Sequence, residues 1–160
     1  MKRLVPALAL VAIIAVALVI TSRGEERESA LPQLSAQRLD GEGEYQLSAL
    51  ADKDEPTLLW FWAPWCTVCN AEAGKIEQLA ADLDVVAIGG RDEVANAPAF
   101  VARHGLTTPT LLFDEPMAIW EHYRIPAQPG AVLLDRDGRE QRRWNGAFDT
   151  AEALEAARAL

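Results

Sequence analysis

The sequence predicts an α/β sandwich with a mixed central sheet. Residues 57–63 and 85–88 form nearly continuous apolar runs, which are typical of central strands covered on both faces. Between them, residues 68–83 have the composition and apolar spacing of a helix. A hairpin pattern over 131–144 and a helical pattern over 150–160 close the chain. Strands that alternate with helices and end in a hairpin indicate helices packed on a mixed sheet.

The segment before the first apolar run predicts a small hairpin. Residues 34–39 alternate loosely, Asp40-Gly41 is typical of a tight turn, and residues 44–47 form the expected returning strand. A short helical turn is expected over 48–51. These elements extend the sheet on the N-terminal side.

After the second apolar run, we expect a helix over 92–104, interrupted near Pro98 and ended by Gly105. The remaining elements are a strand, a short helix, two hairpin strands and a terminal helix, expected over 110–113, 116–123, 131–134, 140–144 and 150–160.

The N-terminus carries a segment that does not belong to this fold. Lys2 and Arg3 precede an apolar run of 17 residues, 4–20, which as a helix would be about 26 Å long, at the short end of a membrane span. No clean cleavage site follows the run, so we interpret residues 1–23 as an uncleaved anchor, with a cleaved signal as the alternative. The leading basic residues favour an N-terminus in the cytoplasm.

The rest of the chain is then expected outside the cytoplasm, as a tether over 24–33 and a folded domain over 34–160. The whole chain carries a net charge of −9 and residues 1–23 carry +3, so residues 24–160 carry −12. Such an acidic body argues against nucleic acid as a partner and against adhesion to anionic lipid.

The two cysteines, Cys66 and Cys69, lie where the first apolar run gives way to the helical pattern. A strand followed by a helix whose first turn carries Cys-x-x-Cys is the layout of a dithiol redox centre. A disulfide across two residues removes little unfolded-state entropy, so stability explains this pair poorly. The spacing therefore predicts a redox enzyme.

Four features carry a family resemblance: the segment Phe61–Cys69 (FWAPWCTVC), Glu72, the segment over 123–129 that ends in Gln128-Pro129 before the 131–134 strand, and an insertion between strand and helix around 107–120. With these, residues 34–160 resemble the thioredoxin superfamily, and within it the exported TlpA, ResA and DsbE-type thiol–disulfide oxidoreductases, particularly actinobacterial DsbE-like proteins. The resemblance implies a thioredoxin-like three-layer sandwich with an N-terminal β-hairpin extension. It implies no cofactor, no metal site and a monomeric protein.

The resemblance implies that Cys66 is the nucleophile, because a helix N-terminus favours a thiolate, and that Cys69 resolves the mixed disulfide. Pro64 and Trp65 are expected to shape the surface beside Cys66. Many thioredoxins carry a buried aspartate where this chain has Trp60, which cannot titrate. The TlpA-like branch instead uses a glutamate, here Glu72, which a helix would place on the same face as Cys69.

The family also has a cis-proline against the active disulfide. That role falls on Pro129, in preference to Pro126, and it leaves the backbone of Gln128 free to meet a substrate chain. The isolated aromatic residues Trp62, Trp120 and Trp144 are expected to pack in the core.

These features predict an extracytoplasmic enzyme that exchanges disulfides with exported protein thiols and is reset by a membrane redox partner. Oxidative folding of exported proteins is the favoured role, and reduction of apocytochrome c thiols is the alternative.

A metal carrier, for example for copper, is the rival from another class, but two cysteines make only half a tetrahedral zinc site, and His104 and His122 are expected at the surface or in loops. A thiol peroxidase would need a Pro-x-x-x-Thr-x-x-Cys loop, which this sequence lacks.

Overall fold

The computed structural model describes residues 31–53 and 55–160. A seven-stranded mixed sheet runs through its centre in the order β2-β1-β5-β4-β3-β6-β7. Strands β3, β4 and β5 are parallel, whereas β1 runs antiparallel to β5 and β6 antiparallel to β3. The strands are β1 (Ser35–Arg38), β2 (Glu44–Gln46), β3 (Thr57–Trp62), β4 (Asp84–Gly89), β5 (Thr110–Phe113), β6 (Gly130–Leu134) and β7 (Glu140–Asn145).

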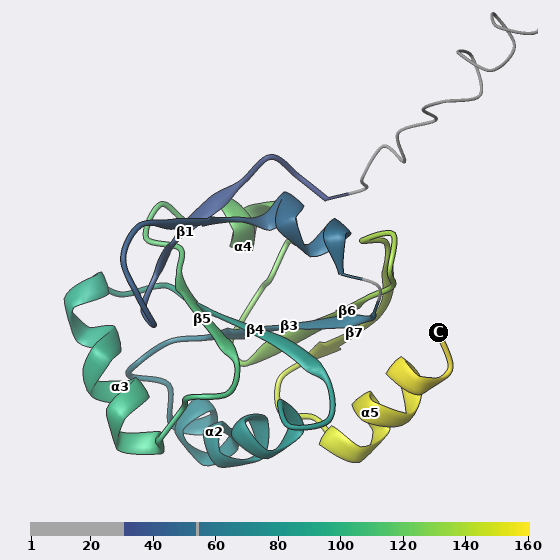
Figure 1. Ribbon diagram of the computed structural model, residues 1–160. Coiled ribbons are helices and arrows are strands. Elements are labelled where there is room, and N and C mark those ends of the chain that lie inside the picture. The colour runs from purple at the N-terminus through teal and green to yellow at the C-terminus, as the bar shows by residue number, and fades with distance from the viewer. Residues whose placement is uncertain (1–30, 54) are drawn as a thin grey trace, which may run out of the picture.

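Helices cover both faces of the sheet, which confirms the predicted three-layer sandwich. Helices α2, α3 and α5 lie on one face and α4 lies on the other (Figure 1). The 3-10 helix η1 packs on the same face as α4. Their bounds are η1 (Leu47–Asp52), α2 (Thr67–Leu79), η2 (Val94–Asn96), α3 (Ala97–His104), α4 (Ala118–His122) and α5 (Thr150–Arg158).

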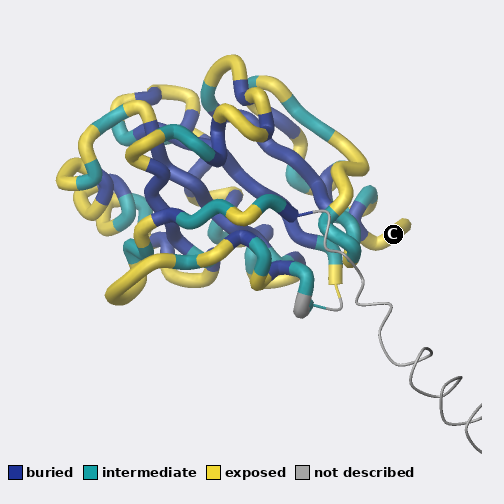
Figure 2. The backbone as a smooth tube through the Cα atoms, turned by 90° about the horizontal axis from the view of Figure 1, so that it is seen from above, coloured by how far each residue is buried: buried dark blue, intermediate teal, exposed yellow. Residues whose placement is uncertain are grey.

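The central strand β3 explains why its sequence is apolar without interruption. All six of its residues are buried, and the buried backbone runs through the middle of the molecule (Figure 2). Trp60 and Trp62 point into the core beneath α2 and α3, whereas Phe61 points into the core beneath α4. A strand with a core on each face favours apolar side chains throughout, and the one polar residue, Thr57 at its start, donates its hydroxyl to the Asp84 carboxylate at 2.8 Å.

Two predicted helix boundaries differ from the structure by more than two residues. Helix α2 ends at Leu79, four residues earlier than predicted, because the chain turns there while Leu83 still packs in the core. The helix expected over 92–104, with an interruption near Pro98, begins only at Val94 as the short η2, and α3 follows from Ala97. Pro98 lies in the first turn of α3, where a missing N–H is tolerated. Gly105 ends α3 in the left-handed conformation (φ 61°), as predicted.

The expected anchor over 1–23 lies outside the described residues, as does most of the tether over 24–33. Within residues 31–53 and 55–160, no helix has the length and apolar character needed to cross a bilayer. Leu31, in the segment expected to be a tether, is buried and packs with the core on the α4 face.

Asp114, at the end of β5, organises the start of α4. This buried carboxylate accepts hydrogen bonds from the backbone N–H groups of Ala118, Ile119 and Trp120 at 3.0, 2.7 and 3.0 Å. It thereby satisfies three donors that a helix start leaves unpaired. The same contacts hold the backbone of Trp120, whose ring is buried, as predicted, and meets the edge of Phe61 with centroids 5.5 Å apart.

Candidate active site

Cys66 and Cys69 lie at the start of α2, directly after β3. Their sulfur atoms are at disulfide distance and their Cα atoms are 5.2 Å apart. Cys66 is the N-cap residue of α2, and its Sγ accepts the backbone N–H of Cys69 at 3.1 Å. Free N–H groups at a helix start stabilise negative charge, so a thiolate at Cys66 would be favoured over a thiol.

The opposite wall of the cysteine pair is the loop before β6. The Gln128–Pro129 peptide bond is cis, as the resemblance implied for Pro129. The backbone carbonyl of Gln128 lies 3.8 Å from Cys66 Sγ. The first cysteine therefore faces main-chain atoms of Gln128, whereas Cys69 is fully buried behind it.

Glu72 is buried on α2, one turn beyond Cys69. Its Oε1 accepts the backbone N–H of Phe148 at 2.9 Å, and its Oε2 has no hydrogen-bond partner among the described residues. Burial raises the pKa of Glu72, against opposing effects from the Phe148 N–H and the Trp60 side chain. No hydrogen bond joins Glu72 to Cys69 within the described part of the chain, although helix geometry places them on one face.

Trp60 occupies the position that carries an aspartate in many thioredoxins, and it is fully buried. The Trp60 indole N–H, like Glu72 Oε2, has no hydrogen-bond partner among the described residues, and the indole opposes the rise in the pKa of Glu72. The titratable group near the cysteines is thus Glu72 on α2, and the corresponding position on β3 carries the neutral indole of Trp60.

The surface beside Cys66 is apolar and exposed. The Trp65 ring is 59 % exposed and Val68 is 44 % exposed. The Trp65 indole N–H donates to the backbone carbonyl of Arg91 at 3.0 Å, so this ring is held in place although it faces solvent. Pro64 is half-buried, and its carbonyl accepts the side-chain N–H of Asn70 at 3.3 Å.

Asn70 is a site residue that the sequence reasoning missed. Its amide nitrogen donates to the carbonyls of Pro64 and Cys66, at 3.3 and 2.8 Å, and its Oδ1 lies 2.9 Å from His104 Nε2. His104, expected at the surface or in a loop, is the half-buried last residue of α3, and burial lowers its pKa. An asparagine in a helix has no sequence signature that would reveal its contact with His104, 34 residues further along the chain.

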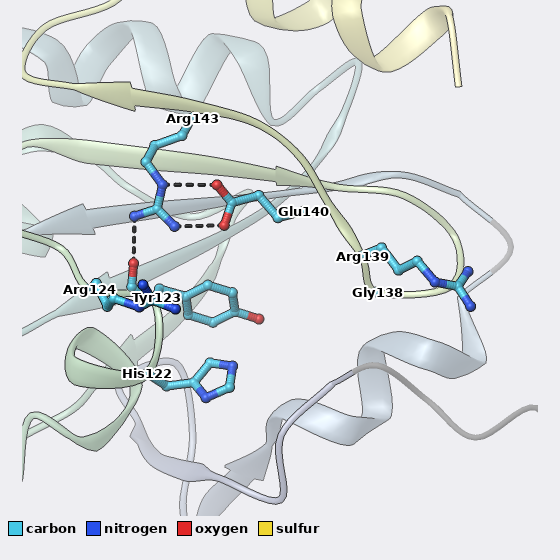
Figure 3. A pocket seen from close by; sticks show the side chains of 7 residues that line it. All are labelled: His122, Tyr123, Arg124, Gly138, Arg139, Glu140 and Arg143. Atoms are coloured by element: carbon cyan, nitrogen blue, oxygen red, sulfur yellow. Dashed lines mark hydrogen bonds and ion pairs between the residues drawn. The ribbon is translucent and has the colours of Figure 1, made fainter.

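A pocket of about 630 Å³ lies away from the cysteines, between the end of α4 and the β6–β7 hairpin (Figure 3). Its lining residues include none of the predicted site residues. Arg143 makes a paired contact with both carboxylate oxygens of Glu140 and also donates to the carbonyl of Tyr123 (Figure 3). Burial, with a smaller effect from Glu140, raises the pKa of Tyr123 to about 12. Arg143 therefore fixes the point where the chain enters the loop that leads to Pro129.

Among the described residues, no group of three or more His, Cys, Asp or Glu side chains could hold a metal ion.

Residues 28–141 match the model of the AhpC/TSA family. The soluble secreted antigen MPT53 of Mycobacterium tuberculosis is 40 % identical over 87 residues, which are 52 % of this chain and 50 % of that protein. The thiol:disulfide interchange protein DsbE of Escherichia coli is 29 % identical over 117 residues, 69 % of this chain and 63 % of DsbE. The chain thus spans about half to two thirds of the length of these relatives.

Solved structures agree with these matches. A secreted M. tuberculosis disulfide oxidoreductase homologous to E. coli DsbE has a TM-score of 0.69 and 33 % identity, covering 86 % of this chain and all of that one. M. tuberculosis DsbF has a TM-score of 0.71 and 30 % identity, covering 79 % of this chain and 94 % of that one.

Proposed function

The chain belongs to the AhpC/TSA family and has the thioredoxin-like fold, and on that premise we propose that it is a thiol–disulfide oxidoreductase acting on exported proteins. One observation carries the proposal. Cys66, at the N-terminus of α2, faces the carbonyl of Gln128 at 3.8 Å, with Cys69 at disulfide distance behind it. The mycobacterial relatives, described as secreted, support an extracytoplasmic site of action.

In the reducing direction, the Cys66 thiolate attacks one sulfur of a substrate disulfide and releases the other as a substrate thiolate. Cys69 then attacks Cys66 Sγ, which breaks the mixed disulfide and releases the second substrate sulfur. The substrate gains two electrons and two protons, and the Cys66–Cys69 disulfide forms. Oxidation of a substrate dithiol follows the same steps in reverse.

The surface around Cys66 suits an extended polypeptide. Trp65 and Pro64 form one side of the approach, and Gln128 and Pro129 form the other. Because proline has no N–H, the main chain of Gln128 is the part of this loop that can pair with a substrate backbone. We propose residues 4–20 as the membrane anchor, with secretion after signal cleavage as the alternative, and a membrane redox partner that resets the cysteine pair.

The reduction potential of the Cys66–Cys69 pair tests whether the protein oxidises or reduces its substrates. For oxidative folding of exported proteins, we expect the full chain in detergent to have a potential well above the roughly −270 mV of thioredoxin, when equilibrated with glutathione buffers. A potential near that of thioredoxin would favour the alternative role in reducing apocytochrome c thiols, which the similarity to DsbE supports.

Mass spectrometry distinguishes the oxidoreductase from the metal carrier. We expect the oxidised and reduced forms to differ in mass by two daltons, with no bound metal. Stoichiometric copper or zinc would instead support the metal carrier.

Glu72 is proposed as the acid–base group for Cys69. We expect Glu72→Gln to slow the attack of Cys69 on a mixed disulfide by about 10- to 100-fold, because a positioned proton acceptor is lost. Stopped-flow kinetics across a pH series measures this rate. The matched control is Glu77→Gln on the same helix, whose carboxylate binds Thr107 and Thr108 instead, and it should leave the rate unchanged. Equal rates in wild type and Glu72→Gln would refute the role.

The same variant should change how stability depends on pH. Burial raises the pKa of Glu72 in the folded protein, so the folded state holds this proton more tightly than the unfolded chain does. The contribution of protonated Glu72 to the free energy of unfolding is therefore complete below the pKa of Glu72 in the unfolded chain. It is lost as pH rises through the pKa of Glu72 in the folded protein. We expect this decline in wild type and its absence in Glu72→Gln, measured as the free energy of unfolding in urea from pH 4 upward.

A further inference from the structure

Three residues that are not glycine have left-handed backbone conformations in the described part of the chain, and all three line one pocket. They are Arg91 (φ 57°), Met117 (φ 63°) and Arg124 (φ 51°). The pocket, of about 330 Å³, is completed by Trp120, Glu121 and Ile125. Such conformations are uncommon for residues with a side chain and gather where function requires a particular backbone path.

Arg91 contacts the cysteine loop through its main chain. It follows β4 after Gly89 and Gly90, and its carbonyl accepts the Trp65 indole N–H at 3.0 Å. Gly90 permits this path, because a Cβ atom there would lie 2.8 Å from Trp120 Nε1. The left-handed turn at Arg91 thus brings its carbonyl to the residue that precedes Cys66.

The side chain of Arg91 contacts the opposite wall. Its Nη2 donates to the carbonyls of Ile125 and Pro126, at 3.3 and 3.1 Å. Its Cζ lies 5.3 Å from the ring centroid of Trp120, within the range of a cation–π contact. These carbonyls belong to the loop that leads to the cis Gln128–Pro129 bond. One residue therefore contacts both Trp65 and the loop over 125–129, the two walls on either side of Cys66.

We propose that Arg91 is a positioning residue that holds Trp65 and the loop over 125–129 at the separation a substrate chain needs between Cys66 and Gln128. The inference rests on the proposed function and deepens it, since it names the residue that joins the two substrate-binding walls. Arginine suits the role because its planar fork donates to two carbonyls while it stacks on an indole, which a lysine ammonium does not do.

The test compares two reactions in the full chain. Disulfide exchange with a synthetic dithiol peptide depends on both walls, whereas alkylation of reduced Cys66 by iodoacetamide depends on the thiolate alone. Arg91→Gly keeps the backbone conformation and the carbonyl that accepts from Trp65, and removes only the side chain. We expect it to lower kcat/KM for the peptide about tenfold, mainly through KM, with alkylation within about twofold of wild type.

Two further variants sharpen the result. Arg124→Gly is the matched control, because it removes a left-handed arginine of the same pocket whose guanidinium makes no hydrogen bond or ion pair within the described residues. It should leave kcat/KM unchanged, and Arg91→Lys should not restore the loss. An unchanged kcat/KM in Arg91→Gly, a full rescue by lysine, or an equal loss in alkylation would each overturn the role. A wild-type protein that exchanges no disulfide with the peptide would overturn the proposed function itself.

Discussion

The Cys69→Ser variant should accumulate a covalent mixed disulfide with its substrate, whereas Cys66→Ser should lose disulfide exchange by a factor on the order of 10³ or more. The reason is their different places at the start of α2. Cys66 faces the Gln128 carbonyl, and the N–H of Cys69 points at its sulfur. Cys69 is fully buried behind it and can reach only Cys66. Non-reducing electrophoresis and mass spectrometry of the adduct measure both outcomes.

The control separates chemistry from folding. Thr67→Ala lies between the two cysteines and is exposed, so it should keep exchange and form no adduct. Circular dichroism should show the same secondary structure for all three variants. If Cys66→Ser formed the stable adduct and Cys69→Ser did not, the roles of the two cysteines would be reversed.

The central features of the fold were predictable because they depend on local pattern. The uninterrupted apolar run of β3 follows from a core on each of its faces, and the parallel strand β4 has the same pattern for the same reason. The end of α2 was not predictable in this way. Leu83 continues the apolar spacing beyond Leu79, but it packs from a turn, and periodicity alone does not distinguish a helix from a turn that points inward.

The site was predictable only where a motif carries the chemistry. The Cys-x-x-Cys spacing after a strand indicates a redox pair without further information. Glu72 came from the resemblance alone, since the backbone N–H that binds its carboxylate belongs to Phe148, 76 residues away in the chain. Arg91 carried no signal, because its partners are carbonyls 34 and 35 residues further on and an indole 26 residues earlier. Arg91 is exposed, as a charged residue after a glycine pair usually is, and only the folded structure shows which carbonyls its side chain contacts.

Trp62→Ala should lower the free energy of unfolding by about 3–5 kcal/mol. Trp62 is fully buried at the end of β3, as predicted for a core residue. Its ring stacks on Phe100 with centroids 4.3 Å apart and meets the edge of Phe113 at 6.4 Å. A Cβ atom at Gly89 would lie 2.9 Å from the Trp62 ring, so this ring fills the space above the neighbouring strand. Its removal leaves a cavity that the rigid sheet cannot close.

The matched variant Trp62→Phe tests whether packing is the cause. The Trp62 indole N–H has no hydrogen-bond partner among the described residues, so phenylalanine removes an unsatisfied donor and keeps most of the ring. We expect a smaller loss of about 1–2 kcal/mol, with urea midpoints shifted at an unchanged m-value. Equal losses in the two variants would contradict packing volume as the cause. Because Cys66 and Cys69 belong to the same core cluster, Trp62→Ala should also lower the rate of exchange, through looser support of the start of α2.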